Sequence, residues 1–258
     1  GCFLDPLERV RVARLDIVGA EVRVALPEGR RVEVADLDVR WAERWGVIEL
    51  DVEARRGLVR LGPGGQELAL QRLAIAGAVD PDEALLELER ADVSLDDIST
   101  TVSGRVDSLC QPHLALDAQI FLPLRTLSQA KLLPKPATGH LWSRVSIAGK
   151  PESPAVSLEL SGNGLGYERF GPANISARLS YAGDEVRLEE VVVPVGMGRV
   201  RASGKLLLTP LLPLEVSLKT EDASLARVLD KAGVKGSWVD FPASLEAQLS
   251  GNLLPRFS

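Results

Sequence analysis

The sequence predicts a mainly β protein, built from many antiparallel strands and elongated by internal repeats. Apolar and polar residues alternate along most of the 258-residue chain, as in strands that have one dry and one wet face. Turn-forming residues separate these runs. A short phrase around a glycine also returns along the chain. Such self-similarity favours one stacked supersecondary unit over a compact catalytic domain.

The predicted strands start near the N-terminus and follow one another closely. Period-two runs occupy residues 10–17, 21–26, 32–34, 37–41, 48–55 and 68–70. In 48–55 the apolar residues all fall on one face and Glu49, Asp51, Glu53 and Arg55 on the other. Turn residues at 27–29, 62–65, 80–82 and 182–184 mark the ends of strands. This pattern is typical of an antiparallel sheet with one solvated face.

The glycine phrase consists of a small residue, a glycine, usually a basic residue, and then an apolar strand. Its glycines are Gly104, Gly149, Gly204 and, more loosely, Gly251, with spacings of 45, 55 and 47 residues. Gly77 follows Ala76 in an earlier, similar phrase. We therefore divide the chain into an N-terminal β-strand region, 1–100, and a repeating region, 101–258.

Two segments depart from the alternation and are predicted to be short amphipathic helices. Residues 224–233 carry apolar side chains at helical spacing and end at a glycine, and residues 123–133 show the same spacing and end before Pro134. A glycine followed closely by a tryptophan comes after each segment. Either these are two copies of one strand–helix–strand unit, or they are unrelated helices that plug the ends of a sandwich.

Composition argues against several functional classes. The net charge of −6 provides no basic face for nucleic acid. His113 and His140 have no carboxylate or cysteine at ligand spacing, and the glycines of 161–166 do not open a helix as a dinucleotide loop requires. The aspartates at 80, 82, 96 and 97 lack the spacing of a calcium loop. We predict no enzyme activity, no metal site and no cofactor.

The two cysteines, Cys2 and Cys110, define neither a metal site nor a disulfide framework. They could pair, or Cys2 could carry a lipid. Residues 1–4 could be the trimmed end of a membrane anchor or of a lipoprotein signal, or a mere cut end of a longer protein. No run of about 18 apolar residues is present, so these residues do not themselves span a membrane.

The glycine phrases, each leading through a proline or a turn to an alternating strand, resemble the AsmA-like superfamily. The similarity is greatest to the TamB group, which are large periplasmic proteins anchored in the inner membrane of Gram-negative bacteria. The matching stretches are 102–106 followed by 112–116, 147–151 followed by 154–160, 202–206 followed by 213–218, and 249–253. They cover about residues 100–258, whereas the first hundred residues are similar only in their alternating strand phrases.

This resemblance implies a curled, taco-like sheet that forms an open hydrophobic groove and moves phospholipids between the inner and outer membranes. It also implies location in the periplasm, an inner-membrane anchor before residue 1, and contact with membranes through regions outside this segment. The expected partners are phospholipid acyl chains and an outer-membrane barrel protein. The expected groove-lining residues are Leu114, Leu116, Ala118, Ile147, Val156, Leu158, Leu160, Ile175, Ala177, Leu179, Val216, Leu218, Leu245, Ala247 and Leu249.

Three functions stay open from the sequence. The first is the lipid conduit. The second is a scaffold for outer-membrane protein assembly that docks barrel strands at a sheet edge by β-augmentation. The third is a structural periplasmic spacer with a filled core, because alternation does not distinguish an open groove from a closed pair of sheets.

Overall fold

The computed structural model describes residues 14–25, 30–60, 67–109, 111–130, 133, 135–167, 170–195, 198–209, 212–224, 226 and 242–252. Strands account for nearly all of these residues, and one short helix accompanies them. Both cysteines and nearly all of the predicted helix 224–233 lie outside the described residues.

The chain forms two compact units, one from residues 1–134 and 146–152 and the other from residues 135–145 and 153–258. The first unit contains β1 (Arg14–Ala25), β2 (Arg31–Arg44), β3 (Val47–Arg60), β4 (Glu67–Asp80), β5 (Leu85–Leu95), β6 (Ile98–Asp107), β7 (His113–Pro123) and α1 (Leu124–Gln129). β8 (Ala137–Lys150) contributes to both units.

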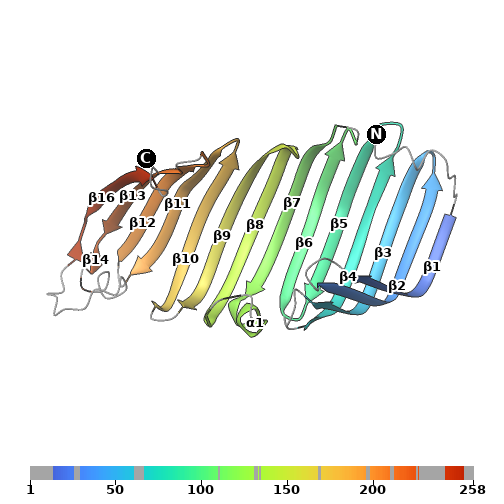
Figure 1. Cartoon of the computed structure of the whole chain (residues 1–258), viewed down its shortest axis with the longest axis horizontal. Helices are drawn as coiled ribbons and strands as arrows, with labels where there is room; N and C mark the ends of the chain where they lie inside the picture. The colour runs from blue at the N-terminus through green and yellow to red at the C-terminus, as the bar shows by residue number, and fades with distance from the viewer. Residues whose placement is uncertain are drawn as a thin grey trace, which may run out of the picture. The chain divides into compact units, whose positions relative to one another are not determined.

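The second unit continues with β9 (Ser153–Tyr167), β10 (Phe170–Ala182), β11 (Glu185–Val195), β12 (Gly198–Leu207), β13 (Pro213–Glu221), β14 (Ala223–Ser224), β15 (Pro242–Ala243) and β16 (Glu246–Asn252). Fourteen of the strands follow one another in a single hydrogen-bonded sheet in the order of the chain, from β1 to β13 and then β16. Figure 1 shows this succession within each unit. The prediction of a mainly β, antiparallel and open sheet is confirmed.

The predicted helix at 123–133 is present, but it is shorter. α1 spans Leu124–Gln129 and follows Pro123, which offers no side-chain cap. Thr126 and Ala130 are buried, and α1 contacts β7. The helix is therefore a tight connection after β7, with one side fixed by packing.

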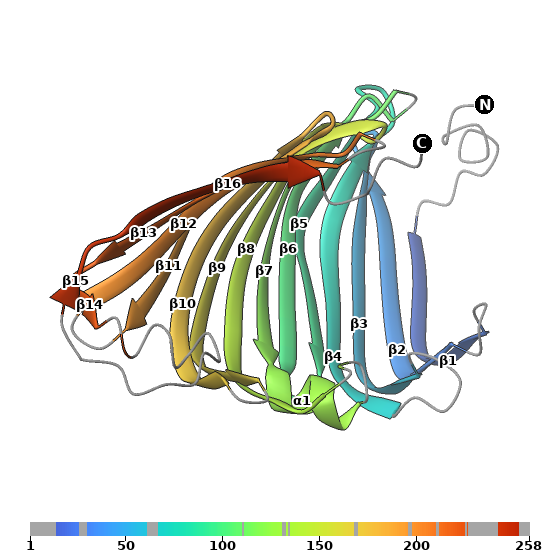
Figure 2. The ribbon, with the colours of Figure 1, turned by 60° about the vertical axis from the view of Figure 1, so that its left-hand side comes forward.

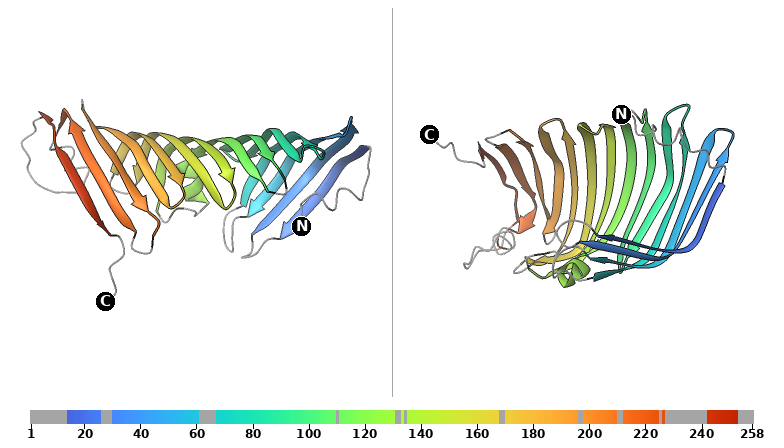
Figure 3. Two further views of the ribbon diagram at one scale, coloured as in Figure 1. Left: turned by 90° about the horizontal axis from the view of Figure 1, so that it is seen from above. Right: turned by 45° about the vertical axis from the view of Figure 1, so that its right-hand side comes forward.

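A corner crosses the strands of the first unit. In β2 the inward-facing apolar positions change phase between Val34 and Leu37, at Asp36, whose φ is 53°. The same change of phase falls in register on the neighbouring strands, because Val34 pairs with Gly57 of β3 and Leu37 pairs with Ala54. The strands turn there, and their ends sweep across the lower part of the right-hand view in Figure 3.

The inside of this corner holds the hydrophobic core of the first unit. Val34, Ala54 and Leu70 pack together there, and partly buried residues from both sides of the corner join them: Val32, Leu37, Leu73, Val93 and Leu95. On the outside, an Asp36–Arg56 ion pair of 2.5 Å is exposed to solvent. The apolar face of the sheet is thus the concave face at this corner.

A β-bulge explains the first glycine phrase. β5 carries one residue more than β6 between the pairs Leu88–Gly104 and Ala91–Val102. At Gly104, whose φ is 136°, an added Cβ would collide with the carbonyl oxygen of Ala115 on β7. Only glycine allows this close approach of two strands next to the bulge.

The second unit has an equivalent β-bulge next to a glycine, one hundred residues later. β11 has an extra residue between Leu188 and Val191, and Leu188 pairs with Gly204 of β12. A Cβ on Gly204 would meet the carbonyl oxygen of Glu215 on β13. Two of the phrase glycines, Gly104 and Gly204, therefore mark equivalent bulged hairpins, β5–β6 and β11–β12, in the two units.

Candidate functional site

The predicted lining residues of the second unit lie in register on one face of its sheet. Strand pairing aligns them in rows that run across the strands. One row is Leu158, Leu179, Leu188, Gly204, Val216 and Leu249, a second is Leu160, Ala177, Val191, Ala202, Leu218 and Ala247, and a third is Val156, Tyr181, Val186, Leu206 and Leu214. Ile175 continues the face opposite Gly162. Leu245 lies just before β16, where its backbone bonds to Thr220.

The first unit carries an equivalent apolar face. Leu114, Leu116 and Ala118 of β7 align with Val106, Gly104 and Val102 of β6. Two rows extend from them toward β1: Leu116, Gly104, Leu88, Gly77, Leu50, Trp41 and Leu15, and Ala118, Val102, Ala91, Ile75, Val52, Val39 and Ile17. Ile147, on the part of β8 that belongs to this unit, is half-buried.

Sequence reasoning missed the contribution of β1–β5 to this face. The first hundred residues lack clear glycine phrases, so they were matched only in style. The alternation that predicted their strands also identifies their inward-facing residues, among them Val39, Leu50 and Ile75. The alternation of apolar and polar residues was therefore sufficient to identify the inward-facing residues of β1–β5.

Away from the corner of the first unit, most described residues of the apolar faces are half-buried or exposed. Contacts between described elements run almost entirely between neighbouring strands, apart from α1 against β7 and β14 against β12. Buried hydrophobic residues are therefore few in the described chain: Val34, Ile48, Ala54, Leu68, Leu70, Ala130, Ala137 and Val195. Exposure increases at the edge strands, where Leu249 is 60% and Leu15 44% exposed.

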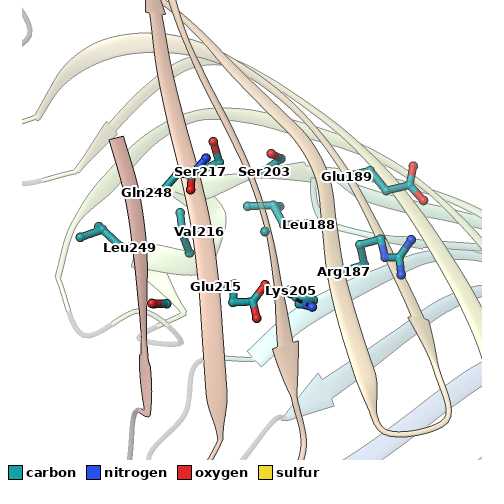
Figure 4. A pocket seen from close by; sticks show the side chains of 12 residues that line it. Arg187, Leu188, Glu189, Ser203, Lys205, Glu215, Val216, Ser217, Gln248 and Leu249 are labelled. Atoms are coloured by element: carbon teal, nitrogen blue, oxygen red, sulfur yellow. Dashed lines mark ion pairs between the residues drawn. The ribbon is translucent and has the colours of Figure 1, made fainter. Parts of the chain in front are cut away.

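A hollow of about 650 Å³ lies over β11, β12, β13 and β16. The row Leu188, Gly204, Val216 and Leu249 runs through its centre, as Figure 4 shows for the three labelled side chains of that row. Charged residues also line this hollow, namely Arg187, Glu189, Lys205 and Glu215. A second hollow of about 650 Å³ in the first unit includes Gly77, Trp41 and Leu50, and charged residues line it as well, among them Arg40 and Glu49.

The opposite face of the sheet is polar and is laced by ion pairs. In the second unit, Arg178 bonds Glu190 at 2.8 Å, Arg201 lies 3.5 Å from Glu190, and the same Arg201 lies 3.5 Å from Glu221. The hydrogen bond from Arg199 lowers the pKa of Glu221. This face is suited to contact with water, which leaves the apolar face as the candidate site.

One carboxylate on the polar face of the first unit is buried. Asp92 accepts a hydrogen bond of 2.8 Å from Thr101 and pairs with Arg90 at 2.6 Å. Burial opposes its charge, but the hydrogen bonds from Arg90 and Thr101 and the charges of Arg90 and Arg72 outweigh it, so the pKa of Asp92 is lowered. Because every partner stabilises the charged form, Asp92 is suited to a structural role and not to proton transfer.

The described residues contain no group of three histidine, cysteine, aspartate or glutamate side chains placed to hold a metal ion. His113 and His140 are exposed, and Nδ1 of His113 lies 3.1 Å from the backbone oxygen of Gln111. No helix among the described residues has the length and apolar character needed to cross a membrane.

Comparison with known proteins adds no relative. No protein-family model matches the chain, and neither the curated proteins nor the solved structures contain a match. The fold and the in-register apolar faces define the class of protein, an open antiparallel β-sheet with an apolar face that no second layer of the described residues covers.

Proposed function

We propose that this chain is a segment of a periplasmic, AsmA-like protein that conducts phospholipids along the apolar faces of its two units. The observation that carries the proposal is the alignment of aliphatic residues from successive strands into rows that no second layer of the described chain covers. A large uncovered apolar surface marks a binding site. Rows of aliphatic side chains suit the acyl chains of phospholipids, whatever the headgroup.

The dimensions of the face suit a lipid tail. From Ile175 to Tyr181 the apolar positions of β10 span six residues, which is about 20 Å of strand at about 3.3 Å per residue. One leaflet of a bilayer has a hydrocarbon thickness of about 15 Å, half of the whole core. An acyl chain therefore fits within the apolar width while its headgroup stays in water.

The free-energy cost of exposing an acyl chain to water means that lipid transport requires such a face. Exposing an acyl chain to water costs about 0.8 kcal/mol per methylene, or about 13 kcal/mol for about 16 methylenes. The leucine and valine rows of the apolar face, which form the floor of each unit, offset most of this cost at every step. Because neighbouring strands present similar apolar residues to each row, a lipid can move along a row from strand to strand without one deep binding minimum.

Charges placed on the floor test the proposal. Leu158→Asp and Val216→Asp, each half-buried on the apolar face, are expected to block lipid passage in the full-length protein while the fold persists. Ser157→Asp is the matched control, since this exposed serine precedes Leu158 and lies on the opposite face of β9. The control should transport as the unmodified protein does. Normal transport with both floor charges in place would refute the conduit.

Bound lipid offers an independent measurement. Native mass spectrometry after removal of detergent is expected to show phospholipid on the purified segment, and less of it in Leu158→Asp than in Ser157→Asp. A lipid-free chain that stays soluble would instead indicate a spacer.

A second candidate rests on the edges of the sheet. β1 and β16 each have a single neighbour among the described strands (Figure 2), so within the described chain each presents an edge to an added strand. This favours a scaffold for outer-membrane protein assembly. Such a scaffold keeps its activity when the floor carries Leu158→Asp and Val216→Asp, which distinguishes it from the conduit.

A further inference from the structure

The β2–β3 hairpin of the first unit ends in an unusual turn. Arg44 pairs with Val47, which leaves a two-residue loop of Trp45 and Gly46. Their φ values are 55° and 83°. A loop with two positive φ values is a type I′ turn, which strongly prefers Asn-Gly or Asp-Gly. Tryptophan is poorly suited to this backbone conformation.

The other two-residue connections between described strands carry common turn residues at their first position. They are Asp96–Asp97 between β5 and β6, Pro151–Glu152 between β8 and β9, and Gly183–Asp184 between β10 and β11. Among these described connections, only the β2–β3 loop has an aromatic residue at its first position. Trp45 is also fully exposed, at 102%. Backbone conformation and solvation both disfavour tryptophan here, so the folded unit itself gives no reason for it.

The strand that precedes this tip also carries a residue of the candidate site. Trp41 lies four residues earlier on the same strand and belongs to a floor row, where it pairs with Leu15 of β1. Leu15 is 44% and Ile17 39% exposed. Between Trp41 and the tip, the same face carries Glu43 on β2 and its partner Ile48 on β3.

The charges near the tip restrict the partner. Asp82 lies close to the turn, since its Oδ2 is 3.8 Å from the place of a Cβ on Gly46. Glu43 flanks the turn, and Glu49 lies 3.8 Å from Arg44. This excess of carboxylates repels an anionic surface. Tryptophan prefers the interface between headgroups and hydrocarbon, where its ring is buried and its N–H stays hydrated.

We propose that Trp45 anchors the β2–β3 tip in the interface of a zwitterionic phospholipid bilayer, at the point where lipids pass between the bilayer and the floor of the first unit. This inference rests on the proposed lipid-conducting function. It adds the place of lipid exchange and the kind of membrane surface that the tip contacts.

The test uses the whole chain and phosphatidylcholine vesicles, with binding measured by flotation. Trp45→Asn places the preferred residue of the turn at this position, so its unfolding midpoint should equal or exceed that of the unmodified chain. Its binding to vesicles is expected to fall by about tenfold or more, since burying part of a tryptophan ring supplies at least that factor. Trp45→Gly, which also suits the turn, should behave in the same way.

Trp142→Asn is the matched control, because Trp142 is 51% exposed on β8. It should bind vesicles within about twofold of the unmodified chain. Adding an anionic lipid to the vesicles should weaken binding. Equal binding by Trp45→Asn and the unmodified chain would overturn the inference, as would failure of the unmodified chain to bind vesicles.

Lipid content separates this inference from the proposed function. If Trp45→Asn loses vesicle binding but retains lipid supplied from detergent micelles, both proposals are supported. If the unmodified chain binds vesicles through Trp45 but never holds lipid after detergent removal, the conduit is refuted and the anchor stands.

Discussion

Gly104→Ala tests whether the glycine phrase marks a structural necessity. Gly104 has a φ of 136°, a backbone conformation that side chains with a Cβ rarely adopt. A Cβ there would also stand 2.8 Å from Cα of Leu116 and 3.0 Å from the carbonyl carbon of Ala115, besides colliding with the oxygen of Ala115. The colliding atoms belong to the backbone of β7, so no side-chain rotation relieves the contact.

The structure supplies a magnitude. The unfavourable φ costs about 1–3 kcal/mol, and the displacement of a packed strand costs about 1–3 kcal/mol more. Alanine also lowers the entropy of the unfolded chain, which offsets about 0.4–1 kcal/mol. We therefore expect the free energy of unfolding of the first unit to fall by about 2–5 kcal/mol.

Urea unfolding followed by circular dichroism measures this change. Gly251→Ala is the matched control, because a Cβ at Gly251 meets no atom within 4 Å. Its stability should change by less than about 1 kcal/mol. Gly204→Ala should fall between the two, since it has the close carbonyl but not the unfavourable φ. If Gly104→Ala unfolds at the same urea concentration as Gly251→Ala, the bulge does not require glycine and the explanation of the repeat is wrong.

Two further predictions concern burial and charge. Leu70→Ala, inside the corner and 6% exposed, should lower the free energy of unfolding by about 2–5 kcal/mol. Leu158→Ala, on the half-buried floor, should lower it by only about 1 kcal/mol. Equal losses in urea titrations would indicate a closed core around both residues. The lowered pKa of Asp92 means that its contribution is complete above the unfolded value of about 3.9 and is lost as pH falls toward the folded value. Asp92→Asn should therefore make stability less dependent on pH below about pH 5, and an unchanged dependence would contradict this role.

Alternation predicted the strands well because its period depends only on local geometry. The runs 32–34 and 37–41 were nevertheless read as separate, whereas the structure joins them in β2. The phase of the apolar residues changes by one position at Asp36, and in a sequence such a change resembles the end of a strand. The corner becomes evident only when β3 and β4 show the same change in register with it.

The glycine phrases show a different limit. Their spacing predicted a repeat, but the reason for each glycine lies on a neighbouring strand. Gly104 is constrained by Ala115 and by the bulge of β5, and neither is adjacent to it in sequence. Pairing partners are long-range information, so a single sequence identified the phrase but not the bulge that requires it.

The residues that stabilise the first unit are separate from the residues of its floor, which explains how the sheet keeps an apolar face that the described chain does not cover. Stability of the first unit is concentrated at the corner, where Val34, Ala54 and Leu70 exclude water from one another. Floor residues farther along the strands, such as Leu116, are only half-buried and contribute less to folding. No second layer of the described chain completes their burial, and under the proposed lipid-conducting function an added hydrocarbon surface does so. A lipid on the floor therefore adds stability by mass action, and the lipid-bound sheet should unfold at higher urea concentration than the sheet from which lipid has been removed.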